Sequence, residues 1–285
     1  MNLPFTRDEF LNAAGPALDV LPENAVQPRS KPRASGLAGD AREQAYSMQG
    51  LPHDGFGVPG SRREPDSVLT SEQGRMYEEL LCRVLECVGW PAAGRQVSLP
   101  EAYPVSGHPD GFLGDGWGVE FKHLGRYKYL EILKHGLEQG APEYLLQGAL
   151  YSDALGYDNM LYIITSQDAS SIRSEMTQNL RAKNPRVRWA GVHDWQHPKV
   201  MLFGVDMKPL KNTLIPQALE RARWLAGKDP LEVALEYNPF PDSKGDVGFP
   251  WSYSTYLSRA QADGQCGEPA PGITGITGRY YDQVI

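Results

Sequence analysis

The sequence predicts an α/β fold in which helices flank a mixed central sheet. Apolar residues recur at helical spacing in one segment before a group of extended segments and in two segments after it. Alternating polar and apolar residues from Trp117 to His123, preceded by Gly114-Asp115-Gly116, indicate a hairpin. The resulting order is helix, meander of strands, helix and strand, and it differs from a run of regular β-α-β units.

The N-terminal part, residues 1–70, is expected to be a largely loop-forming extension, because Pro and Gly recur and apolar periodicity is short. One short helix is expected within it, from Asp40 to Met48. The first long helix is predicted from Ser71, as its N-cap, to Val88. Gly89 and Pro91 then end this helix.

The remaining elements follow from the same two patterns, period-2 alternation for strands and helical spacing for helices. They are the strands Arg95–Leu99, Val105–Leu113 and Trp117–His123, the helices Tyr127–Leu137 and Pro142–Leu155, the strands Met160–Thr165 and Val200–Val205, and the helix Leu214–Leu225. A core domain is therefore expected at residues 71–228, followed by a loop-rich tail, residues 229–285, that packs on it.

The charge of the chain is unevenly distributed. The formal net charge is −7, which argues against a generic nucleic-acid binder, since phosphate contacts need Lys and Arg. Between Ser171 and Lys228, however, 11 Lys and Arg stand against 4 Asp and Glu. Such a basic segment could follow a phosphate backbone, and a salt-bridged, solvated surface explains it equally well.

Cysteine usage and hydropathy bear on the compartment. The three cysteines, Cys82, Cys87 and Cys266, give no disulfide framework, so a reducing compartment is expected. No apolar run reaches the roughly 18 residues that span a bilayer, and the first residues lack the features of a signal peptide. The expectation is a soluble, cytoplasmic protein without a membrane partner.

Two carboxylates and a lysine form the main candidate site. Glu120 and Lys122 lie two apart on one strand and therefore share a face, while Phe121 points the other way, into the core. The hairpin can bring Asp110, at the end of the preceding extended segment, close to Glu120. Carboxylates suit Mg²⁺ or Mn²⁺, to which the Phe121 carbonyl could add an oxygen ligand, and His108 is a further candidate ligand.

This arrangement points to metal-assisted hydrolysis of a phosphate ester. A bound divalent ion polarises the phosphate and lowers the pKa of water, and Lys122 would orient that water or stabilise the developing charge. A Glu-x-Lys pair alone is more often part of a half-exposed strand surface. The catalytic interpretation is favoured because both the loop Gly107–Gly111 and the strand Gly118–Lys122 are present.

Two helices supply further candidates. Gln147 and Tyr151 lie four apart on the Pro142–Leu155 helix, and an amide and a hydroxyl suit a phosphate oxygen or a base. Glu78 lies beside the apolar face of the Ser71–Val88 helix and is therefore a better ligand candidate than Glu79, which lines up with Arg83 on the solvated face. Polar flanks of amphipathic helices explain both observations equally well when each is taken alone.

The candidate motifs are, in order, Gly74 with Glu78, then GHPDG, VEFK and QGALY. The order of these motifs resembles that of the PD-(D/E)XK nuclease superfamily, in particular its RecB-like phage and CRISPR-associated exonucleases. The resemblance covers about residues 30 to 165. It implies a restriction-endonuclease-like α-β-β-β-α-β core. It also implies the following roles by position: Glu78, Asp110 and Glu120 hold the metal, Lys122 completes catalysis, and Gln147 and Tyr151 contact the substrate.

The resemblance implies DNA as substrate, with a role in phage-type recombination, replication or repair in a host cytoplasm. A single-strand-binding or recombination protein is a candidate partner, and the oligomeric state is left open. The leading hypothesis is a metal-dependent exonuclease. The alternatives are a restriction-like or junction-resolving endonuclease, a non-catalytic DNA-binding or assembly module, and a plain α/β protein with chance motifs.

One feature of many relatives is expected to be absent. In them a cysteine upstream of the first catalytic helix joins three near the C-terminus to hold an iron–sulfur cluster. Here Asp40 stands about where that first cysteine would be, and only Cys266 lies in the tail. Four thiolates are the usual requirement, so no iron–sulfur cluster is expected.

Overall fold

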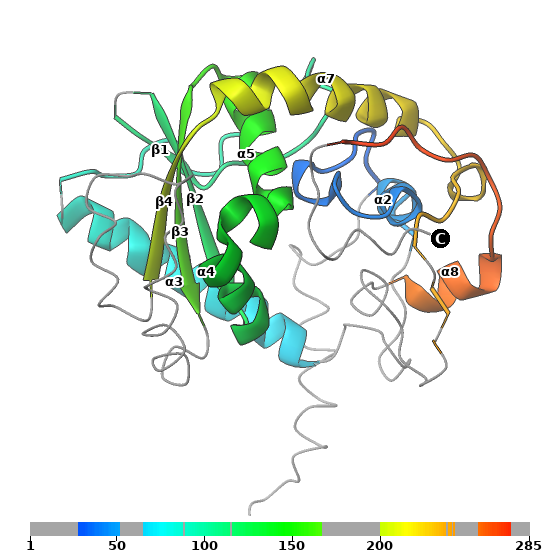
Figure 1. Cartoon of the computed structure of the whole chain (residues 1–285), viewed down its shortest axis with the longest axis horizontal. Coiled ribbons are helices and arrows are strands. Elements are labelled where there is room, and N and C mark those ends of the chain that lie inside the picture. Colours follow the sequence, from blue (N-terminus) through cyan, green and yellow to red (C-terminus); the bar gives the residue numbers. More distant parts are fainter. Residues whose placement is uncertain are drawn as a thin grey trace, which may run out of the picture.

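A computed structural model of the chain describes residues 28–51, 65–87, 89–114, 116–166, 200–237, 239–240, 242 and 256–274. Figure 1 shows a central sheet with helices on both sides and, beside this core, a group of segments from the two ends of the chain. The first half of the basic segment Ser171–Lys228, residues 171–199, lies outside the described residues.

The sheet in the described part has four strands in the order β1-β2-β3-β4. They are β1 (Gly111–Leu113), β2 (Trp117–Leu124), β3 (Asn159–Ser166) and β4 (Val200–Asp206). β1 pairs antiparallel with β2, β2 pairs parallel with β3, and β3 pairs antiparallel with β4. The sheet is therefore mixed, and with its flanking helices it gives the α/β class that the sequence predicts.

Helix α3 (Pro65–Cys87) covers one face of this sheet. Leu81, Cys82 and Leu85 of the helix share one apolar cluster with the alternating strand residues Val119 and Phe121, and with two from β3. Because alternate strand residues point to opposite faces, Glu120 and Lys122 must face away from α3. The packing of α3 thus decides on which side of the sheet the polar pair lies.

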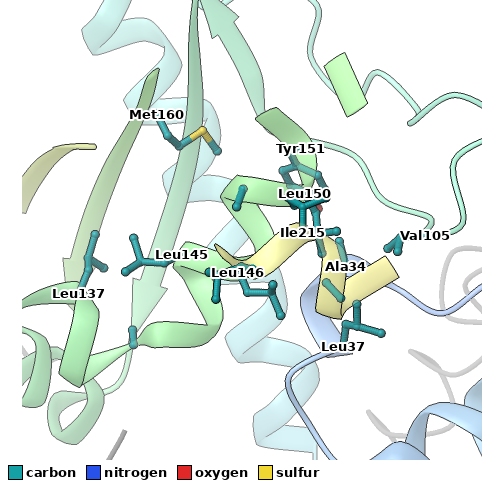
Figure 2. Packing of buried hydrophobic residues seen from close by; sticks show 14 of the residues in the cluster. Ala34, Leu37, Val105, Leu137, Leu145, Leu146, Leu150, Tyr151, Met160 and Ile215 are labelled. Carbon is teal, nitrogen blue, oxygen red and sulfur yellow. The ribbon is translucent and has the colours of Figure 1, made fainter. Parts of the chain in front are cut away.

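Helices α4 (Arg126–Gly140) and α5 (Pro142–Leu155) cover the opposite face. Figure 2 shows α5 residues Leu145, Leu146 and Leu150 packed with Met160 of β3. Helix α4 bends at Gly136, whose φ of 74° lies in the left-handed region that glycine adopts without a steric penalty. This bend divides α4 into two helical parts, the second of which ends at Gly140, before the connection at Ala141 to α5.

Segments from the two ends of the chain pack together beside the sheet. The N-terminal segment contributes η2 (Ala34–Gly36) and α2 (Ala41–Met48). The C-terminal part contributes α7 (Lys208–Leu225), η3 (Pro230–Glu232) and α8 (Leu257–Asp263). Hydrogen bonds from the start of α2 reach residues near 233–237 and 264–266, so the two ends share one buried interface.

Several predicted elements are confirmed and others are wrong. The Pro142–Leu155 helix has the predicted bounds, the two-stranded hairpin forms as expected, and the predicted Asp40–Met48 helix forms with Asp40 as its N-cap. The Arg95–Leu99 strand does not form, because the chain turns there and Gln96 adopts a φ of 58°. Two strands, β1 and β2, therefore precede α4, and the first of the three predicted strands is absent from the described residues.

The bounds of three further elements differ from the prediction. Helix α3 begins at Pro65, six residues before the expected N-cap Ser71, since proline is well suited to the first turn of a helix. Helix α7 begins at Lys208, with Pro216 inside it, whereas the expected start was Leu214. Only the last three residues of the expected Val105–Leu113 strand pair in the sheet, at Gly111–Leu113. Within the described residues, no helix is long and apolar enough to cross a membrane.

Candidate active site

The site lies where β1 diverges from β2. Gly111 pairs with Val119 in the antiparallel ladder, and the chain before Gly111 leaves the sheet. From this point the Asp110 side chain, and not the backbone of β1, bonds the edge of β2. Its Oδ2 accepts a hydrogen bond of 2.7 Å from the backbone N–H of Phe121. In an extended strand the N–H and C=O of one residue point to the same edge, so the Phe121 carbonyl also faces the side of Asp110.

Glu120 is the most enclosed charged group of the site, with 2 % of its surface exposed. Its Oε1 accepts hydrogen bonds from Lys122 Nζ at 2.6 Å and from Gln147 Nε2 at 2.9 Å. Its Oε2 is buried and has no hydrogen-bond partner among the described residues. A buried carboxylate oxygen without a partner costs free energy, and a ligand bound at this oxygen would offset that cost.

The pKa values of the two carboxyl groups also reflect their enclosure and their closeness to each other. Burial raises the pKa of Asp110 to about 8, with a further contribution from the Glu120 carboxylate, although Lys122 opposes the shift. Burial likewise raises the pKa of Glu120, and Lys122 again opposes the shift. Burial by itself would lower the pKa of Lys122, but Glu120, Tyr144 and Asp110 together more than reverse this, and the net shift is upward. Buried Glu120 and half-buried Asp110 thus share one ammonium group, and when both carboxyls are ionised one negative charge is left to be balanced.

Helix α5 lines the site with one face. Gln147 Nε2 donates to the hydroxyl of Tyr151 at 3.0 Å as well as to Glu120, so the two predicted substrate residues are linked to the Glu120–Lys122 pair. The loop before Asp110 packs on this face. A Cβ added at Gly107 would lie 2.7 Å from Tyr151 Cε1, so only glycine lets the loop approach so closely.

Tyr144 of α5 also belongs to the site, although the sequence analysis did not single it out. Lys122 Nζ lies 5.0 Å from the centroid of the Tyr144 ring, and Lys128 Nζ lies 5.7 Å from it. Lys128 is held by Glu143 at 2.6 Å. The spacing of Tyr144, Gln147 and Tyr151, three and then four residues apart, is the signal that could have identified it.

Two predicted site residues are engaged elsewhere in this structure. Glu78 Oε1 accepts a hydrogen bond of 2.9 Å from Arg95, whose second nitrogen bonds Glu79. The charge of Glu78 is still near enough to help raise the pKa of both Asp110 and Glu120. His108 is exposed, and its Nε2 lies 3.1 Å from Ser98 Oγ. The structure therefore brings together Asp110, Glu120, Phe121, Lys122, Gln147 and Tyr151, with Glu78 and His108 at the margin.

These residues fit a hard divalent cation. Among the described residues no group of three or more His, Cys, Asp or Glu side chains is arranged to hold a metal by itself. Mg²⁺ does not require such a cage, because it is usually bound by one or two carboxylates and keeps several waters. Asp110 and Glu120 with the Phe121 carbonyl offer that donor set, and the buried Oε2 of Glu120 is free of hydrogen bonds from the described residues.

Comparisons with known proteins add a likeness of fold. No protein-family model matches the sequence, and no curated protein matches it. The crystal structure of the alkaline exonuclease LHK-Exo from Laribacter hongkongensis is similar at 14% identity and a TM-score of 0.41. The crystal structure of LHK-Exo in complex with dAMP is similar at 13% identity and a TM-score of 0.43. Each match covers 74% of this chain and 88% of the other chain.

Proposed function

We propose that this chain is a metal-dependent deoxyribonuclease that hydrolyses phosphodiester bonds, acting from a DNA end. The observation that carries the proposal is the buried Glu120 Oε2 without a partner among the described residues, beside Asp110 and next to a lysine that already bonds the other oxygen. A surface Glu–Lys pair would leave both carboxylate oxygens to water and would not be buried. Here the enclosure concentrates negative charge where a cation and a phosphate can meet.

Each residue has a role that follows from its contacts. Asp110 and Glu120, with the Phe121 carbonyl, would hold Mg²⁺ or Mn²⁺, which supplies polarisation of the phosphate and a lowered pKa for an attacking water. Lys122 keeps its proton because its pKa is raised, and it is therefore suited to stabilise charge that develops on the phosphate. Gln147 holds Glu120 in place and, with Tyr151, offers polar groups to the substrate.

Action at an end, as opposed to internal cleavage, follows from the resemblance of the ordered motifs to RecB-like exonucleases. A role in phage-type recombination, replication or repair, and a recombination or single-strand-binding protein as partner, belong to the same proposal. The basic segment after Ser171 would follow the DNA backbone, because its 11 Lys and Arg up to Lys228 give it a positive field.

The test is cleavage of end-labelled linear DNA, single- and double-stranded, with Mg²⁺, Mn²⁺ or EDTA. Wild-type protein is expected to degrade DNA only with metal. Asp110→Ala and Lys122→Ala are expected to keep the fold and lose activity by about 100-fold or more. Lys31→Ala is the matched control, since Lys31 also pairs with a carboxylate, that of Glu101, but lies outside both the site and the basic segment. Full activity of folded Lys122→Ala would remove this residue from the mechanism.

A circular single-stranded DNA in the same assay separates an exonuclease from an endonuclease. An exonuclease leaves the circle intact, whereas cleavage of the circle would favour a restriction-like or junction-resolving enzyme. Tight binding of DNA without metal-dependent turnover by a folded protein would instead favour a non-catalytic binding module.

A further inference from the structure

Two aromatic rings are stacked beside the candidate active site. The rings of Tyr77 and His123 have centroids 3.9 Å apart and planes inclined by only 16°. Tyr77 comes from α3 and His123 from β2, so two segments far apart in the sequence form one flat pair. None of the roles assigned so far uses this pair.

The chain places the pair next to the reacting groups. Tyr77 precedes Glu78, and His123 follows Lys122. Along this edge of β2, β1 pairs only as far as Val119, so the rest of the edge has no partner strand among the described residues. As neighbours on β2, Lys122 and His123 lie on opposite faces of the sheet, so a DNA strand that passes the unpaired end of this edge can reach both.

The pair is both fixed and accessible. Nδ1 of His123 lies 2.8 Å from Thr165 Oγ1 on the neighbouring strand, which sets the plane of the imidazole. Tyr77 is 37 % exposed although its ring lies on His123, and the adjacent Met76 is 72 % exposed. A ring that served only to fill the core would be covered, as Tyr129 and Tyr162 are in this chain.

We propose that Tyr77 and His123 form a stacking platform for an unpaired nucleobase adjacent to the scissile phosphate. Nucleobases stack on Tyr and His rings, and this contact is tolerant of sequence because every base has a π face. A base can use the platform only when it is not paired, so the favoured substrate is a single strand or a frayed end. This inference rests on the nuclease proposal and names the substrate class that the same site would take.

The test compares variants of Tyr77 with a variant of a second exposed aromatic residue, each on two substrates. Tyr77→Leu removes the ring, and Tyr77→Phe keeps it without the hydroxyl. Trp90→Leu is the control, because Trp90 is an exposed aromatic just beyond the C-terminal end of α3. Each variant is assayed on a single-stranded oligonucleotide and on the same oligonucleotide with an abasic site at its terminal nucleotide. Binding in EDTA is followed separately by the fluorescence of a terminal 2-aminopurine.

Tyr77→Leu is expected to raise the KM for the intact strand about tenfold, with a smaller change in kcat, because one base–aromatic stack is lost. The KM for the abasic strand should change little, and Tyr77→Phe should behave like wild type on both substrates. Wild-type protein should quench terminal 2-aminopurine in EDTA, and Tyr77→Leu should not. Trp90→Leu should leave all these values unchanged.

The outcomes separate this inference from the nuclease proposal. If Tyr77→Leu weakens binding of intact and abasic strands equally, or Trp90→Leu has the same effect, the platform is overturned while the nuclease proposal stands. If wild-type protein cleaves no DNA with any metal, the nuclease proposal fails. In that case quenching that depends on Tyr77 would still support base stacking, and its absence would overturn the platform as well.

Discussion

Two regions of this molecule bury carboxylates beside basic side chains, and they differ in how completely the polar atoms are paired. One is the candidate active site around Asp110, Glu120 and Lys122. The other, here named the terminal clasp, joins the N-terminal segment to the C-terminal part of the chain and consists of Asp40, Arg42, Arg221 and Glu236. Both are enclosed, yet only the first contains a buried carboxylate oxygen without a partner in the described residues.

In the terminal clasp the carboxylates are fully engaged. Asp40 is 0 % exposed, and its Oδ2 accepts from the backbone N–H groups of Glu236 and Tyr237 at 2.9 and 3.1 Å. Its Oδ1 caps helix α2 by accepting from Arg42 N at 2.9 Å. Glu236 receives two hydrogen bonds from Arg221, at 2.7 and 2.5 Å. Such bidentate pairs fix geometry as well as charge.

Arg42 completes the clasp from within α2. It is 0 % exposed and donates to the carbonyls of Val233, Gly264 and Cys266 at 2.6, 2.5 and 2.6 Å. One guanidinium group thus ties three points of the C-terminal part to a single helix. Arg221 Nε is the exception in this region, since it is buried and has no hydrogen-bond partner within the described part of the chain.

The contrast separates a structural from a functional use of buried charge. Where every acceptor has a donor, the polar network specifies one arrangement of the chain and offers nothing to a ligand. Where two carboxylates share one lysine and an oxygen is left over, the site can accept a further ligand, which we propose is a cation. The completeness of hydrogen bonding, more than burial itself, distinguishes the two regions, and variants can test this distinction.

The largest expected effect is on stability, from Arg42→Met. Methionine fills similar space but removes the donor from the buried carbonyl of Val233 and the half-buried carbonyls of Gly264 and Cys266, which should cost about 3–5 kcal/mol of the free energy of unfolding. Denaturant unfolding measures this cost. Arg83→Met is the matched control, because Arg83 has a 71 % exposed side chain paired with Glu79, and its loss should cost less than about 1 kcal/mol. Equal costs for the two variants would show that the clasp does not hold the ends together.

A smaller effect, with a pH signature, is expected from Asp40→Asn. Burial and the nearby Glu236 carboxylate raise the pKa of Asp40 to about 7, while Glu236 itself is held by Arg221. The folded state therefore binds a proton that the unfolded state releases above about pH 4. The stability due to this proton is present below that pH and is lost as pH rises through about 7.

The asparagine of this variant cannot titrate, and its amide nitrogen would also oppose one pair of backbone donors. The variant should be less stable by about 2 kcal/mol at pH 8, and the deficit should grow by a similar amount on lowering the pH to 5. Thermal unfolding of both proteins from pH 5 to pH 8 measures the difference. A deficit that is constant with pH would mean that Asp40 keeps its charge in the folded state throughout this range.

The sequence predicts the part of this fold that depends on local pattern. Alternation from Trp117 to His123 is enough to place Glu120 and Lys122 on one face of β2, and the Pro142–Leu155 helix has its stop signal in Gly156. The Arg95–Leu99 segment misleads, because its alternating residues suggest a strand while Arg95 in fact pairs with α3. The Arg95 guanidinium bonds Glu78 and Glu79, a contact that no local pattern contains.

The candidate site likewise contains residues that the sequence predicts and contacts that it does not. Its central residues come together because each lies in a motif whose spacing already orients it; they are Asp110, Glu120, Lys122, Gln147 and Tyr151. The engagement of Glu78 by Arg95 and the stacking of Tyr77 on His123 join segments from different elements of the fold. These contacts depend on tertiary packing, which a single sequence read by periodicity cannot supply.

The smallest expected effect is a gain in stability, and it comes from Asp110→Asn. At pH 9, above its raised pKa of about 8, the Asp110 carboxylate is ionised and buried beside Glu120. Asparagine removes that charge, and its side-chain oxygen can still accept from Phe121 N, so the variant should be more stable in EDTA by about 1–2 kcal/mol. Mg²⁺ should raise the Tm of wild-type protein, because it binds the folded state, and should raise that of the variant less or not at all.

Asp153→Asn is the control, since Asp153 is exposed and bonded only to a tyrosine hydroxyl, Tyr103, among the contacts described. It should change neither the stability in EDTA nor the response to Mg²⁺. A loss of stability in Asp110→Asn as large as that in Asp40→Asn would mean that Asp110 is a structural residue like those of the clasp. A gain in EDTA together with a lost response to Mg²⁺ would show that this position gives up stability in the metal-free protein in order to hold a cation.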